Sequence, residues 1–153
     1  TLCGDSVAAL AARESGRKGL RGDMDPLDVC VLTERTINHG GIMVRARPIG
    51  GLRMFDGEEV DDKIIAVLES DPTYESWTEL EHCPPVLIDR IQHYFLTYKD
   101  MPGSSGARVE LAGVYGAETA REVILRSQVD YRAKFGDLER MLDEALSPLD
   151  DAE

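Results

Sequence analysis

The order of the apolar runs along the chain constrains the fold more than any other feature of the sequence. Short apolar runs of strand length are separated by turns rich in Gly, Pro and Asp, and they lie at 27–34, 42–50, 64–70 and 108–116. Two longer stretches with helical spacing follow the third and fourth runs, at 86–99 and 117–146. Strands joined by turns and followed by helices predict an α+β domain built on a small barrel or an open sheet.

The residue types within these stretches support the assignments. Segment 27–34 is a β-branched apolar run, and segment 42–50 alternates with a period of two, as a half-buried strand does. In 86–99 the apolar side chains recur at helical spacing and predict one buried face. The members of this face are Ile88, Ile91, Phe95 and Tyr98. Residues 117–146 predict a second helix with a break at Gly136.

The two ends of the chain are predicted to lie outside this core. Residues 6–15 have the pattern of a short helix, and 1–21 as a whole are expected to form this helix and a loop ahead of the first strand. Residues 147–153 form a polar tail that is expected to fray. A length of 153 residues suits one domain with a real core, so we expect a single domain over 1–153.

The charge balance argues against one class of function. The chain carries 29 acidic and 17 basic side chains, a formal net charge of -12. Because a nucleic-acid binder needs a basic face, we expect no nucleic-acid partner. Acidity suits a protein that holds cations, although solubility explains it equally well. No apolar run approaches the roughly 18 residues of a membrane span, so we expect no membrane partner.

The cysteines indicate a reducing compartment. They are Cys3, Cys30 and Cys83, and no pair has CxxC spacing. An odd, sparse set gives neither a disulfide framework nor a zinc site. We therefore expect a cytoplasmic protein.

Two acidic clusters next to predicted strands are the main candidates for a functional site. The first, GDMDPLD, places Asp23, Asp25 and Asp28 in a turn that Pro26 stiffens. The second, DGEEVDDK, covers 56–63. If the flanking strands pair, both clusters converge on one end of the sheet. Carboxylate oxygens are hard ligands for Mg²⁺, Mn²⁺ or Ca²⁺, and a bound cation would cancel their mutual repulsion.

Two other interpretations of the acidic clusters compete with a metal site. An EF-hand calcium loop is disfavoured because Asp28 stands at the sixth position from Asp23, where that loop requires glycine. A solvated acidic turn remains an alternative for either cluster taken alone. Within the second cluster, Glu58, Glu59 and Asp62 are expected to be solvated rather than to bind a metal.

Three ordered blocks of the sequence resemble family I soluble inorganic pyrophosphatases. DMDPLDV resembles the signature Asp-x-Asp-Pro-x-Asp, and IMVRARPIGGLRMFDGEEVDDKIIAV resembles the second block of the family. HYFLTYKD resembles the late helix of the family, which ends in a Tyr-Lys pair. The resemblance runs from about residue 22 to about residue 128, and it implies a small OB-like five-stranded β-barrel flanked by α-helices.

The resemblance implies Mg²⁺-dependent hydrolysis of pyrophosphate to two phosphates, with several Mg²⁺ ions at one site and Mn²⁺ as a substitute. Asp25 would be the general base that takes the proton of the attacking water. The implied metal ligands are Asp23, Asp28, Asp56 and Asp61. The implied phosphate-binding residues are Lys63, Tyr98 and Lys99. Members of the family are commonly homo-oligomers, so we expect self-association.

For Tyr98 and Lys99, two of the implied phosphate-binding residues, a purely structural role is an alternative. Tyr98 lies on the apolar face of its predicted helix and could be a tyrosine at the edge of the core. Lys99 could be only a cation that interacts with the helix C-terminus.

The sequence departs from the family pattern at four places. Residues 6–20 resemble an insertion before the signature, relative to shorter bacterial members. Met24 stands where a small or polar residue is usual, and Gly57 follows Asp56 where a second carboxylate is common. The family also has an N-terminal segment that supplies barrel strands and substrate-binding side chains. We expect this chain to be a fragment or truncated product that lacks that segment, with an incomplete barrel. Two alternative functions follow: a non-catalytic remnant that binds divalent cations or phosphate, and an acidic interaction module.

Overall fold

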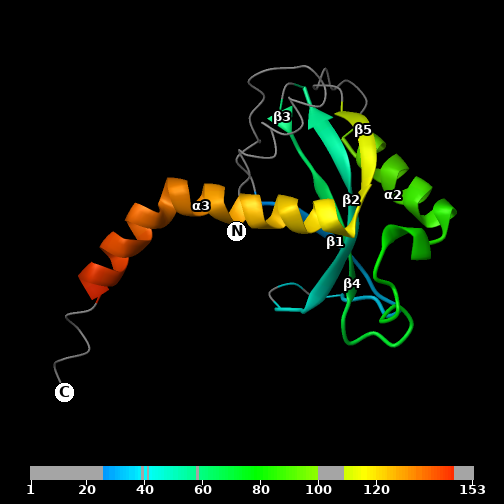
Figure 1. Ribbon diagram of the computed structural model, residues 1–153, viewed down its shortest axis with the longest axis horizontal. Coiled ribbons are helices and arrows are strands. Elements are labelled where there is room, and N and C mark those ends of the chain that lie inside the picture. The colour runs from blue at the N-terminus through cyan, green and yellow to red at the C-terminus, as the bar shows by residue number, and fades with distance from the viewer. Residues whose placement is uncertain (1–25, 39, 41, 58, 100–108, 147–153) are drawn as a thin grey trace.

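The computed structural model describes residues 26–38, 40, 42–57, 59–99 and 109–146, with side chains as far as Arg132. The strands are β1 (Asp28–Leu32), β2 (Ala46–Asp56), β3 (Glu59–Val60), β4 (Lys63–Leu68) and β5 (Val109–Gly116). The helices are α2 (Pro85–Thr97) and α3 (Ala117–Leu146), with a short 3₁₀ turn, η1 (Leu80–His82), ahead of α2. Figure 1 shows the strands gathered beside α2, with α3 extending away from them.

The long strand β2 organises the sheet. It pairs antiparallel with β4 through its first part and with β5 through its second part, and its last two residues also pair with β3. Strand β1 pairs parallel with β4. Because β4 runs parallel to β1 and antiparallel to β2, the beginnings of β1 and β4 lie at the same end of the sheet as the end of β2.

The sheet is packed between two helices, each of which covers one apolar layer. The layer next to α3 consists of Phe55, Val60, Ile64, Ala120 and Val123. The layer next to α2 includes Ile49, Leu52, Met54, Ile65, Val67, Ile88 and Ile91. Neighbouring residues of β4 therefore point to opposite layers, which is the two-residue period of a strand. Burial of each large side chain in these layers stabilises the fold by about 1.5–3 kcal/mol.

Most of the predicted elements are confirmed, with ends that shift by one or two residues. They are the strands predicted at 27–34, 64–70 and 108–116 and the helix predicted at 86–99. The strand predicted at 42–50 overlaps β2, but both of its limits are wrong, because β2 runs from Ala46 to Asp56. The neighbouring strands set the two ends of β2: Ala46 is its first residue that pairs with β4, and Asp56 is its last residue that pairs with β5.

The break predicted at Gly136 is wrong. Helix α3 continues without interruption over 30 residues. A glycine inside a helix costs about 1 kcal/mol relative to alanine, which long flanking helical segments can offset.

The OB-like barrel is confirmed only in part. Five strands and two flanking helices are present, but within the described residues β1 pairs with β4 alone, so closure into a barrel stays a prediction. The helix predicted at 6–15, the segment 1–21 and the tail 147–153 lie outside the described residues. In the part of the chain that the structure describes, neither helix is long and apolar enough to cross a membrane.

Candidate functional site

Members of both acidic clusters meet at one end of the sheet, which we call the acidic end. Asp28, the first residue of β1, is the register partner of Lys63, the first residue of β4. Asp61 lies two residues before Lys63, and Asp56 is the last residue of β2. The predicted convergence of the clusters is confirmed for these residues, while their roles as metal ligands stay predictions.

Lys63 joins the two clusters through its ammonium group. The ammonium nitrogen is 2.7 Å from Oδ2 of Asp28, and it also donates a hydrogen bond to Oδ1 of Asp61. The lysine is 3% exposed, and its ammonium lies 5.6 Å from the centroid of the Phe95 ring of α2. Burial alone lowers the pKa of Lys63, but the hydrogen bonds and charges of the two aspartates outweigh it and raise the pKa. Lys63 is therefore positively charged at neutral pH.

A second ion pair connects the end of α2 to the sheet. The ammonium of Lys99 donates a hydrogen bond to Oδ2 of Asp56 and lies 5.5 Å from the centroid of the Tyr98 ring. The hydrogen bond to Asp56 is the main cause that raises the pKa of Lys99, against a smaller lowering by burial. The ammonium of Lys99 is more accessible to water than that of Lys63, because 43% of the Lys99 side chain is exposed and only 3% of the Lys63 side chain.

Tyr98 does not belong to the buried face that the helical spacing predicted. It caps the C-terminus of α2 and is 42% exposed, whereas Ile88 and Ile91 are buried as expected. Its ring stacks on that of Tyr94, with the centroids 5.5 Å apart. A helix can extend beyond the last of its residues that contacts the sheet. Helical spacing therefore predicts which side of the helix is buried, but not at which residue the buried part ends.

The donor set at the acidic end suits a hard divalent cation. Oxygens of Asp28 and Asp61 already converge on one positive charge, that of Lys63, and carboxylates are the ligands that Mg²⁺ prefers. Among the described residues no group of three or more His, Cys, Asp and Glu side chains is arranged to hold a metal. The predicted ligand Asp23 and the predicted base Asp25 lie outside the described residues.

Asp62 was expected to be solvated, and this expectation is wrong. It is 5% exposed, and the hydroxyl of Tyr115 donates a hydrogen bond to its Oδ2 at 3.2 Å. Burial raises the pKa of Asp62 to about 6, although Arg53 and Tyr115 act in the opposite direction. Burial and the charge of Asp62 also raise the pKa of the Tyr115 hydroxyl. The residue between Asp61 and Lys63 is thus anchored to the sheet.

Gly51 makes the contact between Tyr115 and Asp62 possible. Gly51 and Tyr115 are register partners in β2 and β5, and a Cβ at Gly51 would lie 2.5 Å from the Tyr115 ring. The ring therefore occupies the space that a side chain would fill. The sequence gives no sign of this contact until the pairing of β2 with β5 is known.

Gly57, a departure from the family pattern, has a structural reason. It forms the turn between β2 and β3 with a φ of 64°. Glycine adopts this left-handed conformation without the steric cost that a side chain would bring.

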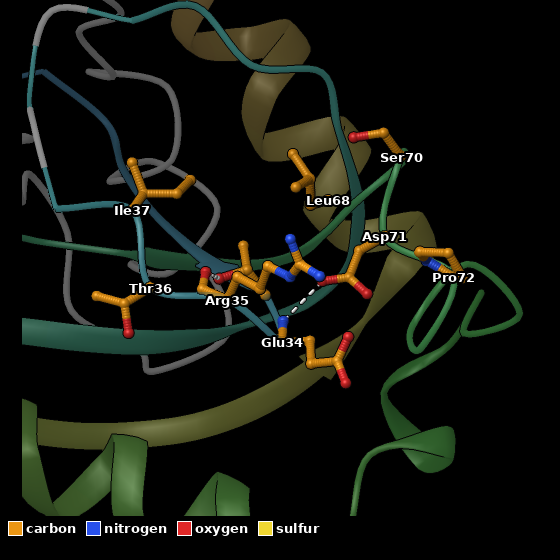
Figure 2. Close-up of a pocket in the computed structure, with 9 residues that line it drawn as sticks. Glu34, Arg35, Thr36, Ile37, Leu68, Ser70, Asp71 and Pro72 are labelled. Carbon is orange, nitrogen blue, oxygen red and sulfur yellow. Dashed lines mark hydrogen bonds between the residues drawn. The ribbon is translucent and has the colours of Figure 1, made fainter.

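The opposite end of the sheet holds a cavity of about 390 Å³, lined by residues that follow β1 and β4. Asp71 is 7% exposed there, and its carboxylate accepts hydrogen bonds from the backbone N–H groups of Glu34 at 2.6 Å and Thr73 at 3.0 Å. Figure 2 shows the Asp71 carboxylate directed at the backbone nitrogen of Glu34. Asp71 thus ties the loop after β1 to the turn after β4. None of the predicted site residues that the structure describes lines this cavity.

Comparison with known sequences identifies a family. The family model described as inorganic pyrophosphatase matches residues 6–132. The chain is 48% identical to an inorganic pyrophosphatase of Chlamydia trachomatis over 135 residues, which cover 86% of this chain and 65% of that protein. The chain therefore spans just under two thirds of the length of this relative.

Solved structures of inorganic pyrophosphatases have a similar fold. The Neisseria gonorrhoeae protein matches with a TM-score of 0.65 and 33% identity, over 74% of this chain and 64% of that chain. The Thermus thermophilus protein matches with a TM-score of 0.66 and 30% identity, over 72% of this chain and 63% of that chain. Since the family model covers most of the sequence, the chain belongs to the inorganic pyrophosphatase family.

Proposed function

We propose that this protein hydrolyses inorganic pyrophosphate to two phosphates in a Mg²⁺-dependent reaction. The observation that carries the proposal is the meeting of both acidic clusters and Lys63 at one end of the sheet, in a chain of this family. Pyrophosphate is a compact polyanion. A site for its cleavage needs carboxylates for divalent cations and fixed positive charges for phosphate oxygens, and the acidic end offers both.

The carboxylates of Asp28, Asp56 and Asp61, together with Asp23, are the proposed metal ligands. Bound Mg²⁺ would supply an activated water and would neutralise charge on the phosphate oxygens. Asp61 is held most firmly of the three described aspartates, because its side chain is only 12% exposed and Asp62 beside it is buried. Asp28 is 61% exposed and can turn toward an incoming ion.

The other proposed site residues accept the proton of the attacking water or bind the phosphate groups of the substrate. Asp25 is the proposed general base that accepts the proton of the attacking water. Lys63 and Lys99 offer ammonium groups and Tyr98 offers a hydroxyl to the phosphate oxygens, where they stabilise charge on the leaving phosphate. Because Lys63 is almost completely buried, its charge acts with little screening by water.

The proposal is tested by phosphate release from pyrophosphate, measured with Mg²⁺ and with EDTA in its place. We expect release only with Mg²⁺, and a loss of about 10²–10⁴-fold in kcat for Asp25→Asn, with Mg²⁺ binding retained. The matched control is Asp89→Asn, which removes one exposed carboxylate from α2 and should leave turnover unchanged.

Two other outcomes would replace the proposal. Mg²⁺ binding without turnover would indicate a non-catalytic cation- or phosphate-binding protein of the same fold. Absence of both Mg²⁺ binding and turnover would favour an acidic interaction module.

The quaternary state is also a proposal. By analogy with the family, we propose that the chain forms homo-oligomers, and sedimentation should then give a mass that is a multiple of 16.9 kDa. A single species at the mass of one chain across the micromolar range would contradict it.

A further inference from the structure

Three aspartates at the acidic end are each bound to a lysine, and this arrangement has a consequence for metal binding. We propose that Lys63 and Lys99 compete with divalent cations for these aspartates, so that cation binding releases both ammonium groups toward the substrate. The inference rests on the proposed function, because it takes the same aspartates as metal ligands.

The first competition takes place at Lys63. Its ammonium contacts Oδ2 of Asp28 and Oδ1 of Asp61 at once, so it lies between the two carboxylates that would share a cation. A divalent cation bound by the same two carboxylates would come within a few ångströms of the ammonium. Since like charges at that distance repel, and the Lys63 side chain is only 3% exposed, the two cations cannot both keep their best positions.

The second competition takes place at Lys99. Its ammonium is hydrogen-bonded to Oδ2 of Asp56, which lies on β2, while Lys99 itself follows the end of α2. A divalent cation on Asp56 would repel this ammonium in the same way. The effect should be smaller, because 43% of the Lys99 side chain is exposed and water screens its charge.

The released lysines differ in where they can go. Lys99 can turn into water, but Lys63 is 3% exposed and its ammonium is held against the Phe95 ring. A buried ammonium that loses its carboxylates needs another anion nearby. A phosphate group of the substrate meets that need, so divalent cations and the anionic substrate should each strengthen the binding of the other.

The experiment measures Mg²⁺ binding by isothermal titration calorimetry in the absence of pyrophosphate, on the full 153-residue chain. The variants are Lys63→Met and Lys99→Met, in which Met keeps the length of the apolar stem and removes the charge. The matched control is Arg90→Met, which removes one exposed positive charge from α2 about two and a half helical turns before Lys99. The control corrects for the change in net charge of the whole protein.

We expect the Kd for Mg²⁺ to fall about tenfold in Lys63→Met and roughly threefold in Lys99→Met, and to stay within about twofold in Arg90→Met. Equal shifts in all three variants would overturn the inference, because net charge alone would then explain them. Unchanged or weaker binding in both lysine variants would also overturn it. If Lys63→Met does not fold, Lys99→Met decides, because its ion pair lies outside the core.

A second readout follows the lysines directly. The ammonium protons of Lys63 are shielded from water, so their NMR signal should be observable without Mg²⁺ and should change during a Mg²⁺ titration with the calorimetric Kd. A signal that is unchanged at saturating Mg²⁺ would show that the ion pairs persist and would overturn the inference. If neither the wild-type chain nor the variants bind Mg²⁺, the proposed function fails as well; binding with an unaltered Kd overturns the inference alone.

Discussion

Two carboxylates, one at each end of the sheet, are largely removed from water but are stabilised by different partners. At the acidic end, Asp61 is paired with the ammonium of Lys63. At the opposite end, Asp71 accepts hydrogen bonds from the backbone N–H groups of Glu34 and Thr73. An ammonium on a flexible stem can be exchanged for another cation, whereas a backbone N–H can leave only if the chain moves. We infer that the acidic end is built for exchange and the Asp71 end for rigidity.

Strands β1 and β4 connect these two ends. They begin at the acidic end with Asp28 and Lys63, and they lead into the loop and the turn that Asp71 joins. The parallel ladder between them sets which residues face each other, and a slip by one residue would turn every side chain of β1 to the other face. The fixed end thus helps to keep Asp28 opposite Lys63.

The largest effect is expected when the charge of Lys63 is removed from the acidic end. Lys63→Met should lower kcat for pyrophosphate about 10²–10³-fold, because a positive charge that stabilises the leaving phosphate is lost, while Mg²⁺ binds more tightly. Steady-state phosphate release, measured at saturating Mg²⁺, tests the expected fall in kcat. The control Arg90→Met should keep the wild-type kcat. Turnover that survives in Lys63→Met would mean that this lysine only neutralises its aspartates.

The next effect concerns the rigid end. Asp71→Ala should lower the free energy of unfolding by about 3 kcal/mol, because two backbone N–H groups lose their acceptor. Urea denaturation measures it as a lower midpoint at an unchanged slope. The control is Glu69→Ala, since Glu69 is exposed and, among the described residues, its side chain makes no hydrogen bond; its backbone N–H donates to the carbonyl oxygen of Arg45. A change in Mg²⁺ affinity in Asp71→Ala as large as that in Lys63→Met would contradict the division between the two ends.

A third prediction concerns the packing of the Tyr115 ring against Gly51, which positions Asp62 next to Asp61. Gly51→Ala should lower the free energy of unfolding by about 2 kcal/mol, because the new methyl group overlaps the Tyr115 ring and forces it aside. Gly113→Ala is the matched control on the neighbouring strand, where a Cβ would meet nothing within 4 Å and should change stability by less than about 1 kcal/mol. Equal effects of the two substitutions would show that the ring does not need this space.

Much of the acidic end could be predicted from the sequence because its signals are local. The aspartates of each cluster stand next to an apolar, β-branched run, and such runs form the interior of a sheet. Once the strands pair, the clusters must lie together, as Asp28 and Lys63 do. The limits of the strands were less predictable, because β2 begins and ends where its partners do.

The hydrogen bonds that hold Asp62 and Asp71 in place could not be predicted, because they join residues far apart in the chain. Asp62 and Tyr115 are 53 positions apart, and Glu34 and Asp71 are 37 apart. In the sequence, Asp62 is one acidic residue among several in a loop, and Asp71 is one residue of an irregular connection. Only the pairing of β2 with β5, and the closeness of the ends of β1 and β4, gives these carboxylates their partners.

The smallest effect is expected from Tyr115→Phe, which separates the two contributions of this residue. Phe keeps the ring over Gly51 but removes the O–H that donates to Asp62, so the free energy of unfolding should fall by about 1 kcal/mol, less than in Gly51→Ala. Tyr74→Phe is the control, because its hydroxyl makes no hydrogen bond within the described residues. If Tyr115→Phe costs as much as Gly51→Ala, the hydrogen bond to Asp62 rather than the packing of the ring anchors the acidic end. If it costs nothing, the position of Asp62 beside Asp61 is set by burial alone.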